Sequence, residues 1–339
     1  MNPVNPVDPV DPVNPVDPVF EAAADAVVSG DAAVLERLLR ESPELIRARS
    51  SRAHHATLLH YVAANGHEDW RQRTPPNAVE IARMLLRAGA EPDAQADMYQ
   101  HRCPTMQMLV SSAHPHIAGL QVALAETLLD AGADVDGVEH DSSPLLTALR
   151  FGYPRTAEAL ARRGARVDDV ISAAALGRTA LVEQFVADDG TLRPGVRLAP
   201  GPWPSLPRDP AVHLAYALTW ACSFGRTDVA ELLLRKGVPA TAADADVTAL
   251  HAAAATGQMN LVRLLLKHGA SLEQLNSYDG TVLDGTIWYA MHAPVEGLDY
   301  AAIVRDLIAM GARTDVYPEL PSYVQAVLNG RRGGGYPNV

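Results

Sequence analysis

Histidine and cysteine side chains of a kind that binds zinc are concentrated in the first third of the chain. They are His54, His55, His101, Cys103, His114 and His116. Imidazole and thiolate are the side chains that zinc prefers. Cys103 precedes a predicted helix that His114 and His116 follow, and ten helical residues span about 15 Å, so at most the first four side chains can meet. Because none of them shows a tight ligand spacing, we expect no bound metal and no other cofactor.

Sequence motifs of enzyme active sites are missing. The chain has no Gly-x-Ser-x-Gly turn, no His-Glu-x-x-His pair and no glycine-rich loop that follows a strand. The acidic pairs Asp168-Asp169 and Asp188-Asp189 are adjacent in sequence, which is typical of helix N-termini rather than of converging catalytic carboxylates. We therefore predict that the protein is not an enzyme.

The composition indicates a folded, acidic protein. The 339 residues are 48% apolar and 20% charged, with a formal net charge of −12. The acidity argues against broad nucleic-acid binding, and no apolar run reaches the roughly 18 residues of a membrane helix. Two distant cysteines and the lack of a secretory signal pattern predict a reducing, cytoplasmic location. Of the 28 basic residues only Lys236 and Lys267 are lysines, which suggests a bacterial origin.

From Phe20 onward the sequence repeats itself. The clearest unit opens with Thr248-Ala-Leu-His251, passes through Gly257 and closes with a leucine-rich stretch that ends at Gly269-Ala270. A second copy opens at Thr57-Leu-Leu-His60. Threonine at the first position caps a helix, and glycine ends one. Since no unit can bury its leucine face alone, neighbouring units must stack.

This pattern resembles the ankyrin repeat, and the resemblance covers roughly residues 20–330. It implies an all-α solenoid of about eight helix-turn-helix units with short β-hairpin fingers and a C-terminal half-repeat cap that opens at Ser322. The units are predicted to begin near Glu21, Thr57, Thr105, Ser143, Asp168, Tyr216, Thr248 and Thr281. Because ankyrin repeats mostly bind proteins, the resemblance implies protein-protein recognition with an unidentified protein partner.

Three segments fall outside the repeat pattern. Residues 1–19 contain Asn-Pro-Val and Asp-Pro-Val triplets, and proline at every third position predicts a disordered, extended arm without helix or sheet. The proline-rich insertion at 191–210 is either a binding loop or a spacer. It marks a position at which the array can bend or break register. Residues 331–339 are predicted to be a flexible tail.

Inserts between the two helices of a unit lengthen three of the repeats, at residues 68–77, 114–119 and 292–298. Such inserts often mark a functional rim, so one alternative is a small-molecule or enzymatic site around Trp70, Arg71, Arg73 and His116. A further alternative is a self-regulated scaffold, in which the proline-rich arm or the 191–210 loop occupies the binding groove.

The resemblance implies that a partner contacts the ends of the first helices and the fingers. The helix-end positions are Asn65, Arg150, Phe151, Leu176, Phe224, Trp288 and Tyr289. The finger positions are Asp97, Tyr99, His101, His140, Asp141, Asp244, Asp246, Tyr278 and Asp279. Aromatic residues make up only 5% of the chain, so four of them at helix-end positions favour a binding stripe. The other interpretation is that inserts cover these side chains as local core.

We predict that replacing Phe224 and Trp288 together by alanine abolishes partner capture and leaves the thermal midpoint nearly unchanged, because interface side chains contribute to binding rather than to the fold. Affinity capture and thermal denaturation of the double variant check this. Unfolding of the variant would show that both residues are core.

Overall fold

A computed structural model of the chain describes residues 17–66, 68–139, 143–200, 206–314 and Gln325. It divides into two compact units. Unit 1 covers residues 1–166 and 200–202, and unit 2 covers residues 167–199 and 203–339.

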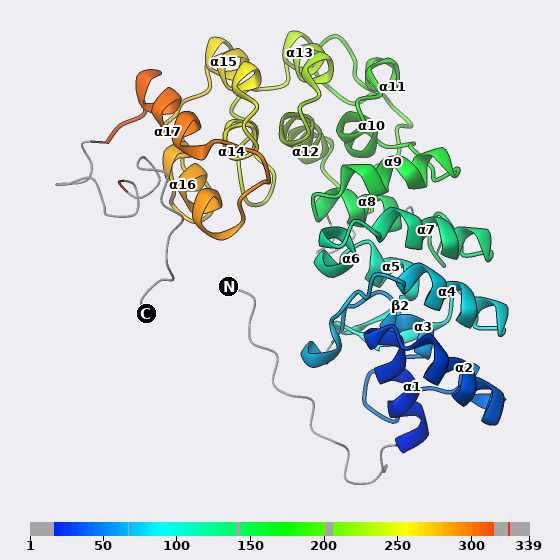
Figure 1. The fold of residues 1–339 in the computed structure, drawn as a ribbon. Coiled ribbons are helices and arrows are strands. Elements are labelled where there is room, and N and C mark those ends of the chain that lie inside the picture. The colour runs from blue at the N-terminus through cyan, green and yellow to red at the C-terminus, as the bar shows by residue number, and fades with distance from the viewer. Residues whose placement is uncertain (1–16, 67, 140–142, 201–205, 315–324, 326–339) are drawn as a thin grey trace. The chain divides into compact units, whose positions relative to one another are not determined.

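Unit 1 is built from helix pairs that follow one another along the chain (Figure 1). Its elements are α1 (Pro18–Ser29), α2 (Ala32–Glu41), η1 (Pro43–Ile46), α3 (Leu58–Tyr61), η2 (Asp69–Arg71), α4 (Ala78–Arg87), β1 (Gln95–Met98), β2 (His101–Pro104), α5 (Thr105–Leu109), α6 (Ala113–Ile117), α7 (Gln121–Asp130), α8 (Ser143–Arg150) and α9 (Pro154–Arg162). The first helices α1, α3, α5 and α8 contact one another in succession, and so do the second helices α4, α7 and α9.

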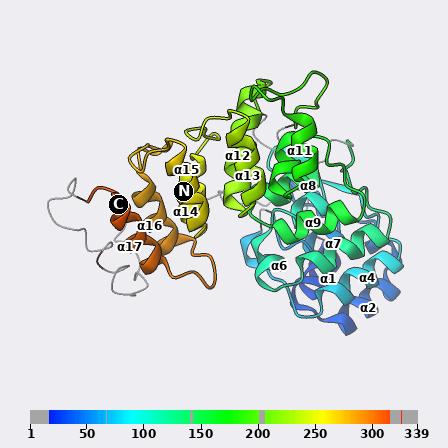
Figure 2. The same ribbon diagram turned by 90° about the horizontal axis from the view of Figure 1, so that it is seen from above.

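Unit 2 is likewise built from helix pairs that follow one another along the chain (Figure 2). Its helices are α10 (Val170–Ala175), α11 (Thr179–Phe185), α12 (Pro210–Ser223), α13 (Thr227–Arg235), α14 (Ala249–Ala255), α15 (Met259–Lys267), α16 (Val282–His292) and α17 (Tyr300–Ala309). The first helices α10, α12, α14 and α16 are in contact in that order. The cap predicted from Ser322 lies outside the described residues, as does the tail at 331–339, and Gln325 alone is described between them.

Small side chains permit the close stacking of the first helices. Every residue of α14 is buried, and five of its seven residues are alanine. Because alanine carries only a methyl group, α12 and α16 can both pack closely against this helix. The second helix of the pair, α15, buries Leu261, Val262 and Leu265. Apolar burial between helices, rather than helix propensity, thus stabilises each pair.

A threonine-histidine pair fixes the spacing between successive units. In unit 2 the hydroxyl of Thr248 lies 2.7 Å from Nδ1 of His251, whose Nε2 donates to the carbonyl of Gly280 at 3.1 Å. In unit 1 the amide of Thr57 donates to Nδ1 of His60 at 3.1 Å, and Nε2 donates to the carbonyl of Cys103 at 3.2 Å. At both positions the signature histidine therefore ties neighbouring turns together.

The finger at residues 95–104 is the predicted β-hairpin. Strands β1 and β2 are antiparallel, with Ala96 opposite Cys103. The turn residues Tyr99 and Gln100 both have positive φ, +51° and +65°, as in the two-residue turns whose twist matches that of the strands. The turn therefore holds Tyr99 at the tip of the finger.

The prediction that residues 1–19 contain no helix is wrong at its C-terminal end. Helix α1 begins at Pro18. Asp17 caps it, because its carboxylate accepts the amide hydrogen of Val19 at 2.9 Å. Proline is tolerated in the first helical turn, where its missing N–H group has no helical partner in any case. Residues 1–16 lie outside the described part of the chain.

The chain divides into its two units within the solenoid that is predicted over residues 20–330. The division between the units falls after Arg166, in the four-residue link from Gly164 to Asp168 that is too short for a hairpin finger, and not in the 191–210 insertion. The first part of that insertion is tied to unit 2, since Arg197 forms an ion pair with Asp168 at 2.7 Å. Trp203 lies outside the described residues.

We expect acid to destabilise unit 1 through His60. Burial lowers the pKa of this imidazole from 6.5 to about 4, against the hydrogen bond to Cys103, which raises it. The unfolded chain therefore binds more protons in this window. The stability that neutral His60 contributes is complete above about pH 6.5 and is lost as the pH falls through about 4, on the order of 3 kcal/mol in total.

Urea unfolding followed by circular dichroism between about pH 7 and pH 5 measures this loss, with His60→Gln as a variant that cannot titrate there. The free energy of unfolding should depend less steeply on pH in the variant. An equal pH dependence in both proteins would contradict the assignment.

Candidate functional site

The end of α16 in unit 2 presents an aromatic surface. Thr281 and Asp284 form a capping box at the start of this 11-residue helix. One turn before its end, the side chain of Trp288 is 52% exposed. The ring of Tyr289 packs edge-on against it with centroids 5.4 Å apart, and that of His292 stacks on it at 4.9 Å. An exposed indole held between two neighbours is a typical anchor of a binding interface.

Two predicted fingers of unit 2 come directly before α14 and α16. In the first finger, Oδ1 of Asp244 accepts the amide hydrogens of Asp246 and Val247 at 2.9 and 2.8 Å. The second finger is tied to the first, because the amide of Ser277 donates to the carbonyl of Asp246 at 3.0 Å. Tyr278, at the tip of the second finger, is 77% exposed. These turns hold both fingertips in place.

Electrostatics link the fingers to the helix end. Burial raises the pKa of Tyr289, and the charges of Asp244 and Asp246 raise it further. We call the predicted residues of these two fingers and of the end of α16 the aromatic-acidic surface. Its members are Asp244, Asp246, Tyr278, Asp279, Trp288 and Tyr289. All six are predicted contact positions, and the contacts among them join Trp288 to Tyr289 and one finger to the other.

Two other predicted helix-end residues of unit 2 are less exposed than Trp288. Phe224 is half-buried at the end of α12. Leu176, predicted as a binding residue, is buried. The reason is Arg226, which donates Nε–H to the carbonyl of Ala175 at 2.9 Å and lies against Gly177. It therefore covers the end of α10, and the prediction that Leu176 faces a partner is wrong.

In unit 1 the predicted residues do not form one cluster. The hydroxyl of Tyr99 donates to Asn65 at 2.7 Å, and the Asn65 amide donates to the carbonyl of Met108 at 3.1 Å. Asn65 thus joins successive first helices, a role that the sequence did not reveal. His101 is exposed on β2. His140 and Asp141 lie outside the described residues.

The end of α8 carries a second aromatic group. Arg150 is exposed, and the neighbouring Phe151 is 49% exposed. Phe151 stacks on Tyr153 with centroids 6.5 Å apart, and Tyr153 stacks on His116 at 4.2 Å. The insert at 114–119 thus contributes a side chain to this group through the short helix α6.

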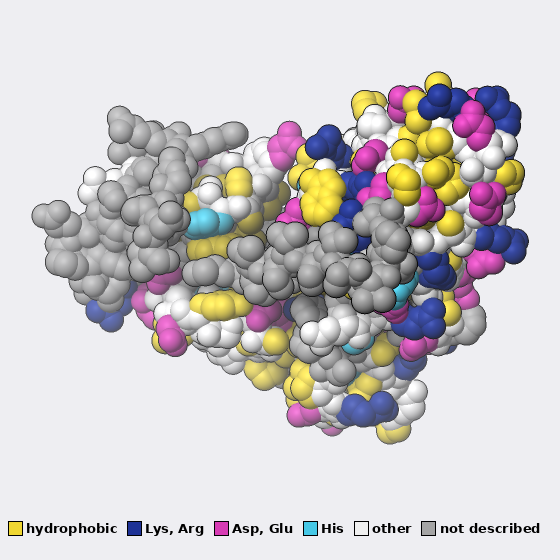
Figure 3. All heavy atoms as spheres, turned by 90° about the horizontal axis from the view of Figure 1, so that it is seen from below, with side chains coloured by type: hydrophobic (Ala, Val, Ile, Leu, Met, Phe, Trp, Pro, Cys, Tyr) yellow, Lys and Arg dark blue, Asp and Glu magenta, His cyan; other side chains and the backbone are white. Residues whose placement is uncertain are grey.

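One face of the molecule carries mixed charge where its side chains are described (Figure 3). On the face that Figure 3 shows, apart from the grey atoms, acidic and basic side chains are interspersed with hydrophobic ones. No helix in the described part of the chain is long and apolar enough to cross a membrane.

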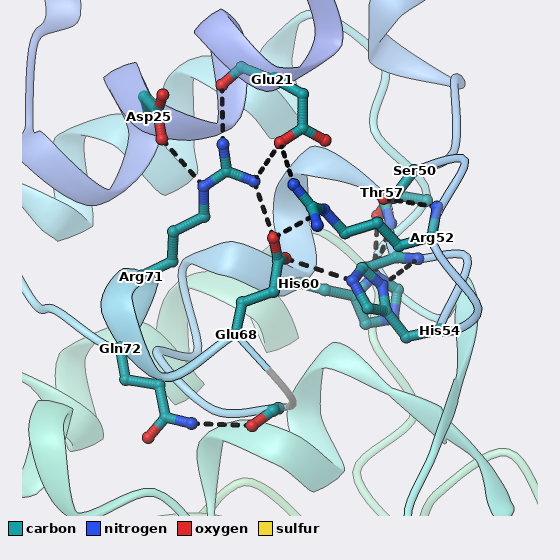
Figure 4. Close-up of polar contacts among 12 residues, drawn as sticks. Glu21, Asp25, Ser50, Arg52, His54, Thr57, His60, Glu68, Arg71 and Gln72 are labelled. Atoms are coloured by element: carbon teal, nitrogen blue, oxygen red, sulfur yellow. Dashed lines mark hydrogen bonds and ion pairs between the residues drawn. The ribbon is translucent and has the colours of Figure 1, made fainter. Parts of the chain in front are cut away.

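The insert at 68–77 folds into a buried charge cluster instead of an open site (Figure 4). Arg71, only 5% exposed, forms ion pairs with Glu21 at 2.7 Å and with Glu68 at 2.8 Å. It also reaches Asp25 at 2.8 Å. Arg52 pairs with the same two glutamates, with Glu21 at 2.9 Å and with Glu68 at 3.0 Å. The cluster therefore fastens the insert to α1 and to the loop around Arg52.

His54 completes the cluster. Its Nδ1 accepts the amide hydrogen of Ala56 at 3.1 Å, so the proton lies on Nε2, 3.2 Å from Glu68. Burial would raise the pKa of Glu68, but the hydrogen bond from His54 and the charge of Arg71 outweigh it and lower that pKa to about 2. The carboxylate stays ionised as part of the fold.

The predicted alternative site around Trp70, Arg71, Arg73 and His116 gains no support from this geometry. The hollow beside Arg71 and Tyr61 offers about 10 Å³ to a water-sized sphere, which is room for about one water molecule. Arg71 is engaged in ion pairs, whereas His116 stacks on Tyr153. Trp70 is exposed under the guanidinium of Arg52.

The candidate zinc ligands do not converge. His54 binds Glu68, and His55 lies 2.8 Å from Asp97. Burial raises the pKa of Cys103 to about 11, which disfavours the thiolate that zinc requires. Among the described residues no group of three or more histidine, cysteine or acidic side chains is arranged to hold a metal ion.

We expect Arg71→Met to lower the free energy of unfolding by about 3 kcal/mol, because it leaves Glu21 and Glu68 buried with less compensating charge. Arg73→Met is the matched control, since Arg73 is exposed in the same insert and its loss should cost less than about 0.5 kcal/mol. Urea denaturation measures both. Equal stabilities of the two variants would contradict the role of the cluster.

Comparison with known proteins identifies the repeat. Residues 171–279 match the family model described as ankyrin repeats (3 copies), and residues 54–97 match that of a single ankyrin repeat. A similar solved structure is the crystal structure of the human ASB11 ankyrin repeat domain, with 20% sequence identity, coverage of 86% of this chain and 97% of that chain, and a TM-score of 0.40. None of the curated proteins matches the chain. Residues 54–97 and 171–279 are therefore ankyrin repeats.

Proposed function

We propose that this protein is a protein-interaction module whose partner binds at the first-helix ends and the fingers, with the aromatic-acidic surface of unit 2 as the main contact. Ankyrin repeats are generally protein-interaction modules, which supports this class of function. The observation that carries the proposal is the exposure of two large aromatic side chains in unit 2, Trp288 at a helix end and Tyr278 at a fingertip.

Exposed aromatic side chains support a binding role for physical reasons. Leaving an indole in water forgoes the favourable free energy of burying it, and Trp and Tyr are enriched among the residues that contribute most to binding. The rings of Trp288, Tyr289 and His292 already pack on one another, so little side-chain freedom is lost on binding. Phe151, whose position in its repeat unit corresponds to that of Tyr289, is a second contact in this proposal.

We place the protein in the cytoplasm, in keeping with its free cysteines. Cys103 and Cys222 are both unpaired. Burial raises their pKa values to about 11 and about 12, so neither thiol is activated for exchange.

Affinity capture from a lysate of the source organism, followed by mass spectrometry, tests the proposal. We expect wild type to retain a protein that Trp288→Ala loses by at least about tenfold, because truncating a central aromatic anchor typically costs 2 kcal/mol or more. Trp70→Ala is the matched control, since Trp70 is 49% exposed in unit 1.

Both variants should keep the thermal midpoint of wild type, which denaturation scans verify. If folded Trp288→Ala retains the same protein as wild type, this surface is not part of the interface. If wild type selectively retains no protein, the proposal of protein recognition is contradicted.

A further inference from the structure

We propose that a small cavity in unit 1 binds one water molecule, which joins the hydroxyl of Tyr61 in α3 to the carboxylate of Glu68 beside η2. The site belongs to unit 1 and does not rest on the proposed function.

The cavity has the size and the lining of a water site. It offers about 10 Å³ to the centre of a water-sized sphere, which is the room that one water molecule takes. Its polar lining comes from Tyr61, Glu68, Arg71 and Gln72. A buried cavity with only apolar walls stays dry, whereas one with several polar groups holds water that bonds to them.

The hydroxyl of Tyr61 is a buried polar group that needs a partner. Tyr61 is only 7% exposed, and its hydroxyl oxygen is buried and forms no hydrogen bond with any described residue. An unsatisfied buried hydroxyl costs free energy, and a bound water recovers most of it. Burial and the charge of the neighbouring Glu68 raise the pKa of Tyr61, so the hydroxyl keeps its proton and can donate it.

Packing fixes the position of this hydroxyl. Phe20 and His54 each pack edge-on against the ring of Tyr61, both with centroids 6.3 Å apart. The guanidinium of Arg71 lies 5.6 Å from the centroid of the same ring. Because the hydroxyl moves only with the ring, the partner that it needs has to enter the cavity.

Glu68 keeps an acceptor position for the water (Figure 4). Its Oε1 lies 3.0 Å from Nε of Arg52 and 2.8 Å from a terminal nitrogen of Arg71, and its Oε2 lies 3.2 Å from Nε2 of His54. A carboxylate accepts about four hydrogen bonds, so these contacts leave Oε2 able to accept one more. A water that accepts the proton of Tyr61 and donates to Glu68 has two of the two to four partners typical of buried water.

The water completes a junction between three segments of unit 1. The ion pair of Arg71 with Glu21 fastens the insert at 68–77 to α1. The water fastens the same insert, through Glu68, to α3, the first helix of its own repeat.

A crystal structure of the full chain, at a resolution that shows ordered water, tests the site directly. We expect one water in the cavity, with its oxygen about 2.6–3.2 Å from both the Tyr61 hydroxyl and Oε2 of Glu68. A cavity without water density, or a direct hydrogen bond from Tyr61 to Glu68, would overturn the proposal.

Urea unfolding of Tyr61→Phe gives a second, independent test. With water bound, the substitution removes a satisfied hydrogen bond, so we expect the unfolding equilibrium constant to rise by about fivefold. Without a partner for the hydroxyl, the same substitution would lower that constant, since phenylalanine buries no polar group. A variant more stable than wild type would therefore overturn the proposal.

Tyr153→Phe is the matched control. It removes a hydroxyl from another buried tyrosine of unit 1, one that does not line the cavity. We expect its unfolding equilibrium constant to stay within about twofold of wild type. An equal rise in both variants would overturn the proposal, because the loss would then be common to any tyrosine hydroxyl of this unit.

Discussion

Each helix pair of this protein presents an apolar face that it cannot enclose alone, and burial of that face against the next pair is the interaction on which the rest of the structure depends. The all-buried helix α14, built largely of alanine, shows how closely successive first helices must approach. Such stacking requires a fixed spacing, which the hydrogen bonds from His60 to Cys103 and from His251 to Gly280 maintain. Once these layers are fixed, the helix ends and fingers remain as surface. The exposed aromatic residues of the described chain lie there, apart from Trp70 in the 68–77 insert.

Much of the fold could be predicted because local signals repeat. Thr57, Thr248 and Thr281 were predicted to open units, and each is the residue that precedes a first helix. The role of the signature histidines and the hairpin at residues 95–104 also follow from the repeat pattern. The candidate surface was predicted only as separate positions, because sequence spacing does not show which fingertip lies next to which helix end.

What the sequence could not show depends on side chains that come from distant segments. Leu176 is buried because Arg226 covers the end of its helix, and no local pattern reports such a contact. The buried charge cluster joins Glu21 to Arg71, which are far apart in sequence. The only hint was that charged residues of the insert had no place in the repeat pattern. The 68–77 insert is expected to form a functional rim, but these long-range ion pairs hold it against α1 as part of the fold.

We propose that the fingers and first-helix ends of unit 2 form the binding surface. Hydrogen-deuterium exchange of the full chain, with and without its captured protein partner, tests this most directly. The account predicts slower exchange on binding at residues 244–247, 276–280 and 285–292, and no change in the second helices α11 and α13. Protection confined to the second helices or to the buried cluster of unit 1, with residues 276–292 unchanged, would contradict it.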